Sequence, residues 1–283
     1  MLKEPLLTII MPVYNTADYL AHAFEALLRQ DEPNFKLIVV DDGSTDDSAA
    51  IAQKYAQQFP YFKLVQKSNG GPSEARNVGM KYVDTPYFTF HDGDDWVSHG
   101  YTAYFLRAFK EHPECDLVSC GYWLDYSNKP EKVVGHFESG EINRAEAYLK
   151  MTNVFGSPIK GYSWNKAFKT EVVRKYKLKF DRDISLLEDQ IFSVKYMSHC
   201  EKMYYTQHPY YHYRQRQGSI IHQPSIKKVK DNFLGNYRVW NRIIKSLLAS
   251  ENSKSERTVR KLSESTLIRS NNEGKGKRGR TIL

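Results

Sequence analysis

Residues 6–30 of the chain read LLTIIMPVYNTADYLAHAFEALLRQ, which is a short apolar run followed by a helical pattern. The run Leu6–Tyr14 predicts a buried strand, and the polar residues 15–18 predict the turn that ends it. After this turn the apolar residues recur every three or four positions, as they do along one face of a helix. A strand followed at once by a helix is the building unit of α/β proteins.

The same unit repeats through the first third of the chain. Further strands are expected at residues 35–40, 62–67 and 87–92, and helices at 48–59 and after the glycine-proline turn at 70–72. Asp46 or Asp47 is expected to cap the first of these helices. Strands and helices that alternate in this way form a mostly parallel central sheet with helices on both faces, so the predicted fold class is α/β.

After Trp96 the pattern is less regular. We expect a helix at 101–112, a strand at 116–126, an antiparallel or loop-rich lid at about 127–160, and a helix at 185–200. Residues 202–216 predict one or two edge strands, because Pro209 cannot donate a hydrogen bond to a ladder. Residues 225–248 have apolar residues at helical spacing, and the polar residues beyond 250 are expected to be disordered.

The charge of the chain is unevenly distributed. The formal net charge is +8, and residues 224–283 hold 15 lysines and arginines against 5 acidic residues. The excess positive charge therefore belongs to the C-terminal fifth. The three cysteines lack metal-ligand spacing and suit a reducing cytosol. No signal peptide is expected, and no apolar run approaches the roughly 18 residues that a membrane span needs.

Polar clusters follow three of the predicted strands, where ligands bind in parallel sheets: residues 41–42, 69–71 and 92–95. In the last cluster, Asp92 and Asp94 are two positions apart in an extended segment, so their side chains point to the same side. Two carboxylates on one side suit Mg²⁺ or Mn²⁺, which also accept phosphate oxygens of a substrate as ligands. The alternative is a solvated acidic turn in which Asp95 caps a helix.

Seven segments, in order, resemble the family-2 inverting glycosyltransferases with the GT-A fold, such as the bacterial enzymes that build capsules, exopolysaccharides and teichoic acid decorations. The segments are TIIMPVYN (8–15), VVDDGSTDDS (39–48), NGGPSEARNVGMKY (69–82), FHDGDDWV (90–97), WNKAFK (164–169), LEDQIFSVKY (187–196) and YYHYRQRQGSI (210–220). The resemblance implies a GT-A catalytic domain over 1–223, with a nucleotide-binding half (1–98) and an acceptor-binding half (99–223). A basic helix (224–250) and a polar tail (251–283) follow it.

The resemblance also implies which residues bind the nucleotide-sugar. Pro12 and Tyr14 would frame the base. Asp41 would accept a hydrogen bond from the uracil ring nitrogen, which favours a UDP-sugar as donor. Asn69 and Arg76 would reach the base or the ribose, and the alternative for Arg76 is a surface cation on its helix.

The same resemblance assigns the chemistry. Asp92 would lie near the ribose, and Asp94 would ligate the Mn²⁺ or Mg²⁺ that bridges the diphosphate. The catalytic base would be Asp189, the second residue of a Glu-Asp pair before an apolar helix. Glu188 beside it would raise the pKa of the pair's second ionisation toward useful basicity. The alternative is that both acids only complement the dipole of their helix.

The segment HYRQR supplies the remaining candidates. Arg214 and Arg216 share a side if the segment is extended, and guanidinium groups suit diphosphate oxygens. His212 is a candidate metal ligand or a contact to the leaving group. A solvated basic strand is the alternative for the segment. Residues 164–166 are expected to line the acceptor side or to brace the lid, and His91 is expected to be structural.

The basic C-terminal helix has three interpretations. By default it packs on the catalytic domain. It could instead lie on an anionic membrane surface, with Phe233 and Trp240 facing lipid, which would make the cytoplasmic protein peripheral to the membrane. It could also pair with a second copy as a homo-oligomer. Nucleic-acid binding is not expected, because no recognised fold or stacking platform accompanies the basic residues.

Together these features predict a metal-dependent glycosyltransferase that moves a sugar from a UDP-sugar to a glycan, a teichoic-type polymer or a lipid-linked acceptor. A sugar nucleotidyltransferase should have a G-x-G-x-R loop after the first strand, and a dehydrogenase should have a G-x-G-x-x-G loop there. This chain has MPVYNTADY (11–19) at that place, which counts against both classes. The alternative from another class is a non-catalytic subunit that binds a nucleotide-sugar in a polysaccharide-synthesis complex.

Overall fold

The computed structural model describes residues 4–126, 129–135, 138–152, 161–184, 186–215 and 230–251. The first part of the chain forms β1 (Leu7–Val13), α1 (Ala17–Leu28), β2 (Lys36–Asp41), α2 (Ser48–Tyr55), the 3-10 helix η1 (Ala56–Gln58), β3 (Phe62–Gln66), α3 (Pro72–Met80), β4 (Tyr87–Phe90) and β5 (Trp96–Val97). The second part forms α4 (Tyr101–Glu111), β6 (Leu117–Tyr126), β7 (Lys132–Val134), β8 (Gly140–Asn143), α5 (Arg144–Thr152), β9 (Lys166–Lys169), α6 (Thr170–Tyr176), α7 (Glu188–Met197) and β10 (Lys202–Gln215). Residues 230–251 are helical.

The described strands form one 10-stranded sheet with the order β3-β2-β1-β4-β9-β6-β10-β5, in which β7 pairs with β6 and β8 with β10. The neighbours β3, β2, β1 and β4 are all parallel, as predicted for the first half. β9 is antiparallel to both β4 and β6, and β10 is parallel to β6. The α/β class is therefore confirmed, and the second half adds antiparallel pairings to a parallel beginning.

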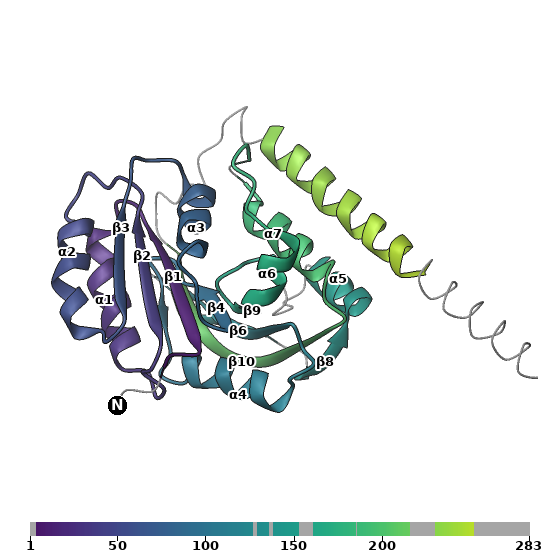
Figure 1. Ribbon diagram of the computed structural model, residues 1–283, viewed down its shortest axis with the longest axis horizontal. Coiled ribbons are helices and arrows are strands. Elements are labelled where there is room, and N and C mark those ends of the chain that lie inside the picture. The colour runs from purple at the N-terminus through teal and green to yellow at the C-terminus, as the bar shows by residue number, and fades with distance from the viewer. Residues whose placement is uncertain are drawn as a thin grey trace, which may run out of the picture. The chain divides into compact units, whose positions relative to one another are not determined.

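Helices cover both faces of the sheet (Figure 1). The odd-numbered residues of β1, from Leu7 to Val13, belong to a core that includes apolar residues of α1, α2 and α4. Successive side chains of a strand point to opposite faces, so Ile10 meets α3 on the other side. There a Cβ added to Gly79 would lie 2.3 Å from Cγ2 of Ile10. Only a glycine lets α3 approach β1 this closely.

Aromatic rings fill the second face and attach α7 to the sheet. Phe90, the last residue of β4, packs edge-on against Phe192 of α7, with ring centroids 6.0 Å apart. Phe180 stacks on Phe192 at 4.1 Å, and Phe168 of β9 contacts it at 5.6 Å. Buried rings of this size are major contributors to core stability. This packing brings the start of α7 to the carboxyl end of β4.

The expectation of edge strands at residues 202–216 is wrong. Lys202–Gln215 form one 14-residue strand, β10, which pairs with β6 on one side and with β5 and β8 on the other. Pro209 is accommodated because the register with β6 shifts on both sides of it, between Tyr205 and Tyr211. An irregular point in the ladder is where a residue without an N–H can be tolerated inside a sheet.

By internal contacts the chain divides into two units, residues 1–240 and 241–283, and residues 241–251 of the second are helical where the structure describes them. The tail beyond residue 251 lies outside the described residues. Cys115, Cys120 and Cys200 are free and buried. In the described ranges, no helix combines the length and the apolar character that a membrane span requires.

Candidate active site at the carboxyl edge of the sheet

The carboxyl ends of the four parallel strands lie at one edge of the sheet. Val13 of β1 pairs with Asp41 of β2, and Asp41 pairs with Gln66 of β3. Ile10 of β1 pairs with Phe90 of β4. The predicted nucleotide-binding residues lie in the last residues of these strands or in the loops that follow them: Pro12, Tyr14, Asp41, Asn69, Asp92 and Asp94. The sheet therefore gathers them at one edge.

The residues predicted to surround the base differ in exposure. Tyr14 is 45% exposed, and Asn69 is exposed in the loop between β3 and α3. Pro12 is half-buried. Asp41 is buried, and its Oδ1 accepts a hydrogen bond from the backbone N–H of Ser44 at 3.0 Å. An exposed ring and a fixed carboxylate at the ends of adjacent strands are chemically suited to the flat face and the polar edge of a base.

Two other aspartates shape the loops at this edge. Asp42 accepts hydrogen bonds from the backbone amides of residues 70–71 at 3.0 and 2.7 Å, and so joins the loops after β2 and β3. Asp46 accepts from the amide of Ala17, where α1 begins, and from the amide of Ser48, where α2 begins, each at 3.0 Å. Carboxylates that bind amides in this way stabilise turns and helix N-termini.

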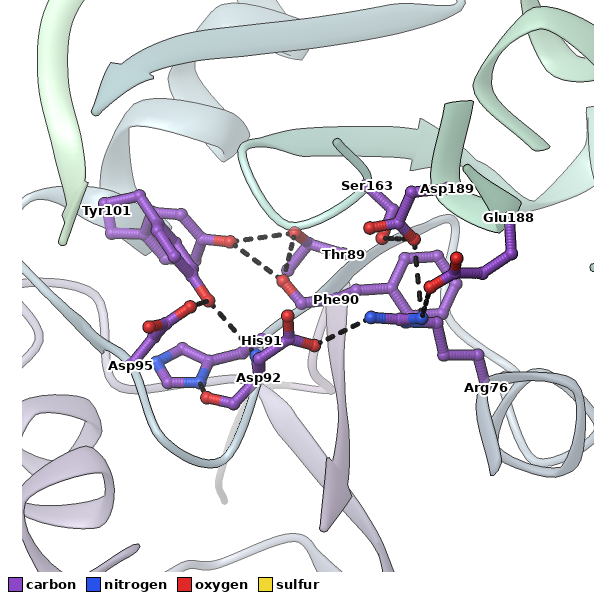
Figure 2. A network of polar contacts seen from close by, with 11 residues as sticks. Arg76, Thr89, Phe90, His91, Asp92, Asp95, Tyr101, Ser163, Glu188 and Asp189 are labelled. Atoms are coloured by element: carbon purple, nitrogen blue, oxygen red, sulfur yellow. Dashed lines mark hydrogen bonds and ion pairs between the residues drawn. The ribbon is translucent and has the colours of Figure 1, made fainter. Parts of the chain in front are cut away.

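Arg76 of α3 joins the two sides of the site (Figure 2). Its side chain is 5% exposed. Nη2 donates to Oδ1 of Asp92 at 3.0 Å, and Nη1 donates to Oε1 of Glu188 at 3.2 Å. Nη1 also lies 3.5 Å from Oδ1 of Asp189. Three carboxylates therefore hold Arg76 inside the protein, which rules out the surface position that was its alternative, and its predicted contact with the base or the ribose stays a prediction.

The charges of this cluster perturb one another. Burial raises the pKa of Glu188 to about 7, Asp189 adds to the rise, and Arg76 opposes it. Burial also raises the pKa of Asp92 to about 6; Arg76 lowers this pKa, while Asp189 and Asp94 raise it. Burial alone would lower the pKa of Arg76, but the carboxylates raise it above its ordinary value.

Asp189, the predicted base, is the second residue of α7 and has a partner that the sequence did not predict. The hydroxyl of Ser163 donates a hydrogen bond to Oδ1 of Asp189 at 2.8 Å (Figure 2). Ser163 is fully buried. The sequence signal that could have identified Ser163 as a site residue is its position directly before WNKAFK, a segment that resembles the family.

The carboxylates that follow β4 fit a divalent cation. Asp92 and Asp94 are half-buried, and each supplies hard oxygen donors of the kind that Mg²⁺ and Mn²⁺ prefer. Asp94 and Asp189 both raise the pKa of Asp92, which means that like charges are close together here. A cation bound by Asp92 and Asp94 would relieve this repulsion. The donor set is therefore compatible with the expected metal.

His212 lies apart from these carboxylates. Its ring stacks on Trp96 with centroids 3.4 Å apart, and its Nε2 is 3.0 Å from Oγ of Ser98. Burial lowers the pKa of His212 to about 4. The neighbouring Tyr211 faces the cluster instead, because successive residues of a strand alternate in direction. The structure thus does not bring His212 together with Asp92 and Asp94 as a third metal ligand.

Among the described residues, the group of three potential metal-ligating side chains with ligand atoms within 4.8 Å of one another is His112, Glu114 and Glu141. It lies at the end of α4 and on β8, away from the carboxyl edge. His112 and Lys202 both form ion pairs with Glu141, at 2.7 and 3.1 Å. These contacts already compensate the acidic charge, so this group adds nothing to the candidate site.

Asp95 connects the loop after β4 to β10. Its buried carboxylate accepts from the hydroxyl of Tyr211 and from the amide of Arg214, both at 2.8 Å. The same hydroxyl accepts from the amide of Asp92 at 3.1 Å. Burial raises the pKa of Asp95 well above its ordinary value. Asp95 is therefore a link between distant segments and not the cap of a helix.

The remaining candidates have structural contacts or lie outside the described residues. The guanidinium of Arg214 contacts α1, where Nη2 is 2.8 Å from Nδ1 of His22 and the group lies 5.0 Å from the ring centre of Tyr19. Arg216 lies outside the described residues. Residues 164–166 are buried, which favours the bracing role over an acceptor surface. His91 is buried too, as expected, and its Nδ1 is 2.9 Å from the carbonyl oxygen of Asp92.

Comparisons with known proteins show which family the chain belongs to. Residues 8–176 match the model of Glycosyl transferase family 2. EpsH of Bacillus subtilis (strain 168), which bears the name of a glycosyltransferase, is 30% identical over 239 residues that cover 83% of this chain and 68% of EpsH. The minor teichoic acid biosynthesis protein GgaB of the same organism is 30% identical over 232 residues, which cover 80% of this chain and 25% of GgaB.

Solved structures have the same fold. The crystal structure of S. aureus TarS 1–349 in complex with UDP-GlcNAc superposes with a TM-score of 0.68 at 22% identity, and the match covers 83% of this chain and 66% of that one. The complex of TarS 1–349 with UDP gives a TM-score of 0.67 over 86% of this chain and 65% of that one. This chain thus spans about two thirds of the TarS structures. The matched family model covers more than half of the chain, and the chain belongs to glycosyltransferase family 2.

Proposed function

We propose that this glycosyltransferase transfers a sugar from a UDP-sugar to a hydroxyl group, with inversion and with the help of a divalent metal. The observation that carries the proposal is the cluster in which Arg76 joins Asp92, at the strand edge, to Glu188 and Asp189. It brings a donor-side carboxylate and a candidate base to one cation. Such convergence of perturbed acids is typical of active sites.

The proposed donor follows from the strand edge and from the related structures. The TarS structures contain UDP and UDP-GlcNAc. In this chain Tyr14 would contact the uracil ring and Asp41 would accept from its ring N–H, with Asn69 nearby on the next loop. The ring N–H of uracil can donate a hydrogen bond to a carboxylate, whereas the ring nitrogen at the same position of cytosine carries no hydrogen. We therefore expect UDP compounds to bind better than CDP compounds.

The proposed metal is Mg²⁺ or Mn²⁺, held by Asp92 and Asp94. When bound, such an ion neutralises the negative charge that develops on a departing nucleoside diphosphate. The protein's own contribution is to hold the two carboxylates. The loop that carries them is fixed by the contact of Asp92 with Arg76 and by the contacts of Asp95 with β10.

The proposed reaction is a single displacement. The acceptor oxygen bonds to the anomeric carbon from the face opposite UDP, and the bond from that carbon to the phosphate oxygen breaks, with its electron pair leaving on UDP. Asp189 takes the proton of the acceptor hydroxyl. Attack from the opposite face inverts the anomeric configuration. The acceptor is a glycan, a teichoic-type polymer or a lipid-linked saccharide, as supported by the relationship to GgaB.

The helix at residues 230–251 is proposed as an attachment element. Large apolar side chains on it are exposed at helical spacing: Phe233 79%, Tyr237 61%, Trp240 50%, Ile244 54% and Leu248 55%. Lys230 and Lys245 on the same helix are exposed as well. An exposed apolar stripe with basic neighbours suits an anionic lipid surface, and pairing with a second copy is the alternative.

The donor is tested with a thermal-shift panel of UDP-, GDP-, CDP- and dTDP-sugars, each with and without Mn²⁺. We expect a metal-dependent rise in Tm with UDP compounds, and its absence would contradict the donor assignment.

The base is tested with Asp189→Asn. This variant should bind UDP as before and lose about 100-fold or more of its turnover. If the protein is a non-catalytic subunit, both the wild type and Asp189→Asn would bind UDP-sugar, and neither would release UDP.

A further inference from the structure

One oxygen of Asp189 is occupied and the other is not. Oδ1 accepts from the hydroxyl of Ser163 at 2.8 Å and lies 3.5 Å from Nη1 of Arg76. Within the described part of the chain, Oδ2 accepts no hydrogen bond. The side chain of Asp189 keeps 15% of its surface exposed. The carboxylate is therefore fixed by one oxygen and open at the other.

We propose that Ser163 and Arg76 are positioning residues for the catalytic base, which hold Oδ1 of Asp189 so that Oδ2 receives the proton of the acceptor hydroxyl. This inference rests on the proposed role of Asp189 as the base. The inference adds two residues to the proposed active site. Ser163 and Arg76 do not touch the reacting atoms, but they orient the carboxylate of Asp189 so that one of its oxygens faces the acceptor hydroxyl.

Ser163 can fix the carboxylate because it is itself immobile. It is fully buried, and the segment around it is held by other contacts. Two residues on, Asn165 donates from Nδ2 to the carbonyl oxygen of Cys120 at 2.8 Å. On the other side, the carbonyl oxygen of Tyr162 accepts from Nζ of Lys166 at 2.6 Å. A hydrogen bond from a rigid donor pre-organises a reactive group without cost at the moment of reaction.

Arg76 adds a second function to the positioning. Because its other nitrogen binds Asp92 at 3.0 Å, the same guanidinium sets the distance between the donor side and the base (Figure 2). The rigid planar fork of arginine can hold two carboxylates in a defined geometry, which a lysine ammonium cannot do. The base and the donor-side carboxylate are thus placed relative to each other by one side chain.

Ser163 is tested with Ser163→Ala and the matched control Ser193→Ala. Both serines are fully buried with one side-chain hydrogen bond, but only Ser163 contacts the base. We expect Ser163→Ala to lower kcat roughly 10-fold to 100-fold, with the Kd of UDP unchanged. Ser193→Ala should change the Tm by a similar amount and leave kcat as in the wild type. Equal kcat values in the two variants would overturn the proposal for Ser163.

Arg76 is tested with Arg76→Lys, which keeps a buried cation where Arg76→Ala would leave three carboxylates uncompensated and could unfold the protein. We expect kcat to fall at least 10-fold. The matched control is Arg238→Lys, since Arg238 also contacts two carboxylates, Asp181 and Asp183, but lies outside the site. Wild-type kcat in Arg76→Lys would overturn the proposal for Arg76.

The Asp189→Asn background separates the inference from the proposed function. If Asp189 is the base, Ser163→Ala should cause no further loss of turnover in the Asp189→Asn protein, because residue 189 then has no carboxylate that accepts a proton. A further loss as large as that in the wild type would mean that Ser163 acts elsewhere and would overturn the inference alone. Near-normal turnover of Asp189→Asn itself would overturn the assignment of the base, and the inference with it.

Discussion

The two halves of the sheet are assembled in different ways. In the first half, β1 to β4 are parallel neighbours, and each is joined to the next by a helix that covers the sheet. In the second half, β9 reverses direction between β4 and β6, and β10 pairs with strands from both halves. The first half therefore depends on a repeated local unit, and the second on pairings between distant segments.

This difference reappears at the active site. The first half supplies Arg76, Asp92 and Asp94 from loops and a helix at the ends of its strands, whereas the second half supplies Ser163, Glu188 and Asp189. The ion pairs of Arg76 are among the contacts that join the halves (Figure 2). The two sides of the candidate site are thus built by different rules and meet at one buried charge.

The largest expected effect concerns the charge at this meeting point. Glu188 has its pKa raised from 4.5 to about 7 by burial and by Asp189. Because the native state binds this proton more tightly, its contribution to stability is full below pH 4.5 and is lost as the pH rises through 7. Relative to Glu188→Gln, the wild type should lose about 3 kcal/mol of unfolding free energy between pH 4.5 and pH 8.

Urea denaturation at a series of pH values measures this difference. The control is Glu25→Gln, at an exposed ion pair of α1, which should keep the pH dependence of the wild type. Parallel curves for the wild type and Glu188→Gln would show that the halves are not coupled through a proton on Glu188.

The second prediction compares one glycine from each half. Gly79→Ala places a Cβ 2.3 Å from Cγ2 of the fully buried Ile10, between α3 and β1. Gly140→Ala, on β8, meets no atom within 4 Å. Overpacking should lower the unfolding free energy of Gly79→Ala by about 2 to 3 kcal/mol, more than the gain in helix propensity offsets. Gly140→Ala should stay within about 0.5 kcal/mol of the wild type.

The midpoints and slopes of urea unfolding curves give both values. If Gly79→Ala is as stable as the wild type, the contact between α3 and β1 is looser than this packing requires. A double variant with Ile10→Ala should then also be additive, whereas a real clash predicts that the two changes partly compensate.

The contrast between the halves explains what could be read from the sequence. Alternating strand and helix patterns located β1 to β4 within about a residue or two, and the polar residues after them indicated the ligand edge. Each of these features depends on a local period and on the rule that parallel strands end together. The Glu-Asp pair at the start of α7 was identified through the family resemblance.

The other features depend on which distant segments meet. Pro209 suggested an edge strand, but β10 is internal because a register shift accommodates the proline. A surface position was the alternative for Arg76, but Glu188, 112 positions away, helps to hold its side chain inside the protein. The sequence signal for Ser163 is only its place before the segment WNKAFK, and its contact with Asp189 depends on a residue 26 positions away. Local patterns contain no information on such partners.

The third prediction tests the other link between the halves. The hydroxyl of Tyr211 binds the carboxylate of Asp95 and the amide of Asp92, whereas the hydroxyl of Tyr104 binds one carbonyl, that of Ser119, within the second half. Removing the hydroxyl of Tyr211 leaves the buried carboxylate of Asp95 and the amide of Asp92 without this hydrogen-bond partner. Tyr211→Phe should therefore cost about 2 kcal/mol and Tyr104→Phe about 1 kcal/mol of unfolding free energy.

The functional readout separates the two tyrosines more clearly than their stabilities do. Tyr211→Phe releases the loop that carries Asp92 and Asp94, so the metal-dependent binding of UDP, measured by calorimetry, should weaken. Tyr104→Phe should bind UDP as the wild type does. Equal binding by both variants would mean that the loop is positioned without the contact to β10.

The smallest effect on stability is expected in the C-terminal helix, which belongs to neither half of the sheet. Phe233 and Trp240 are 79% and 50% exposed, so replacing both by serine should change the unfolding free energy by less than about 0.5 kcal/mol. The same double variant should lose binding to vesicles of anionic lipid in a flotation assay, because burial of these two side chains in the interface would drive attachment. If vesicle binding is unchanged while the sedimentation coefficient falls, the stripe is instead a contact between copies. A stable, active variant with neither change would show that the helix is an inert end of the described chain.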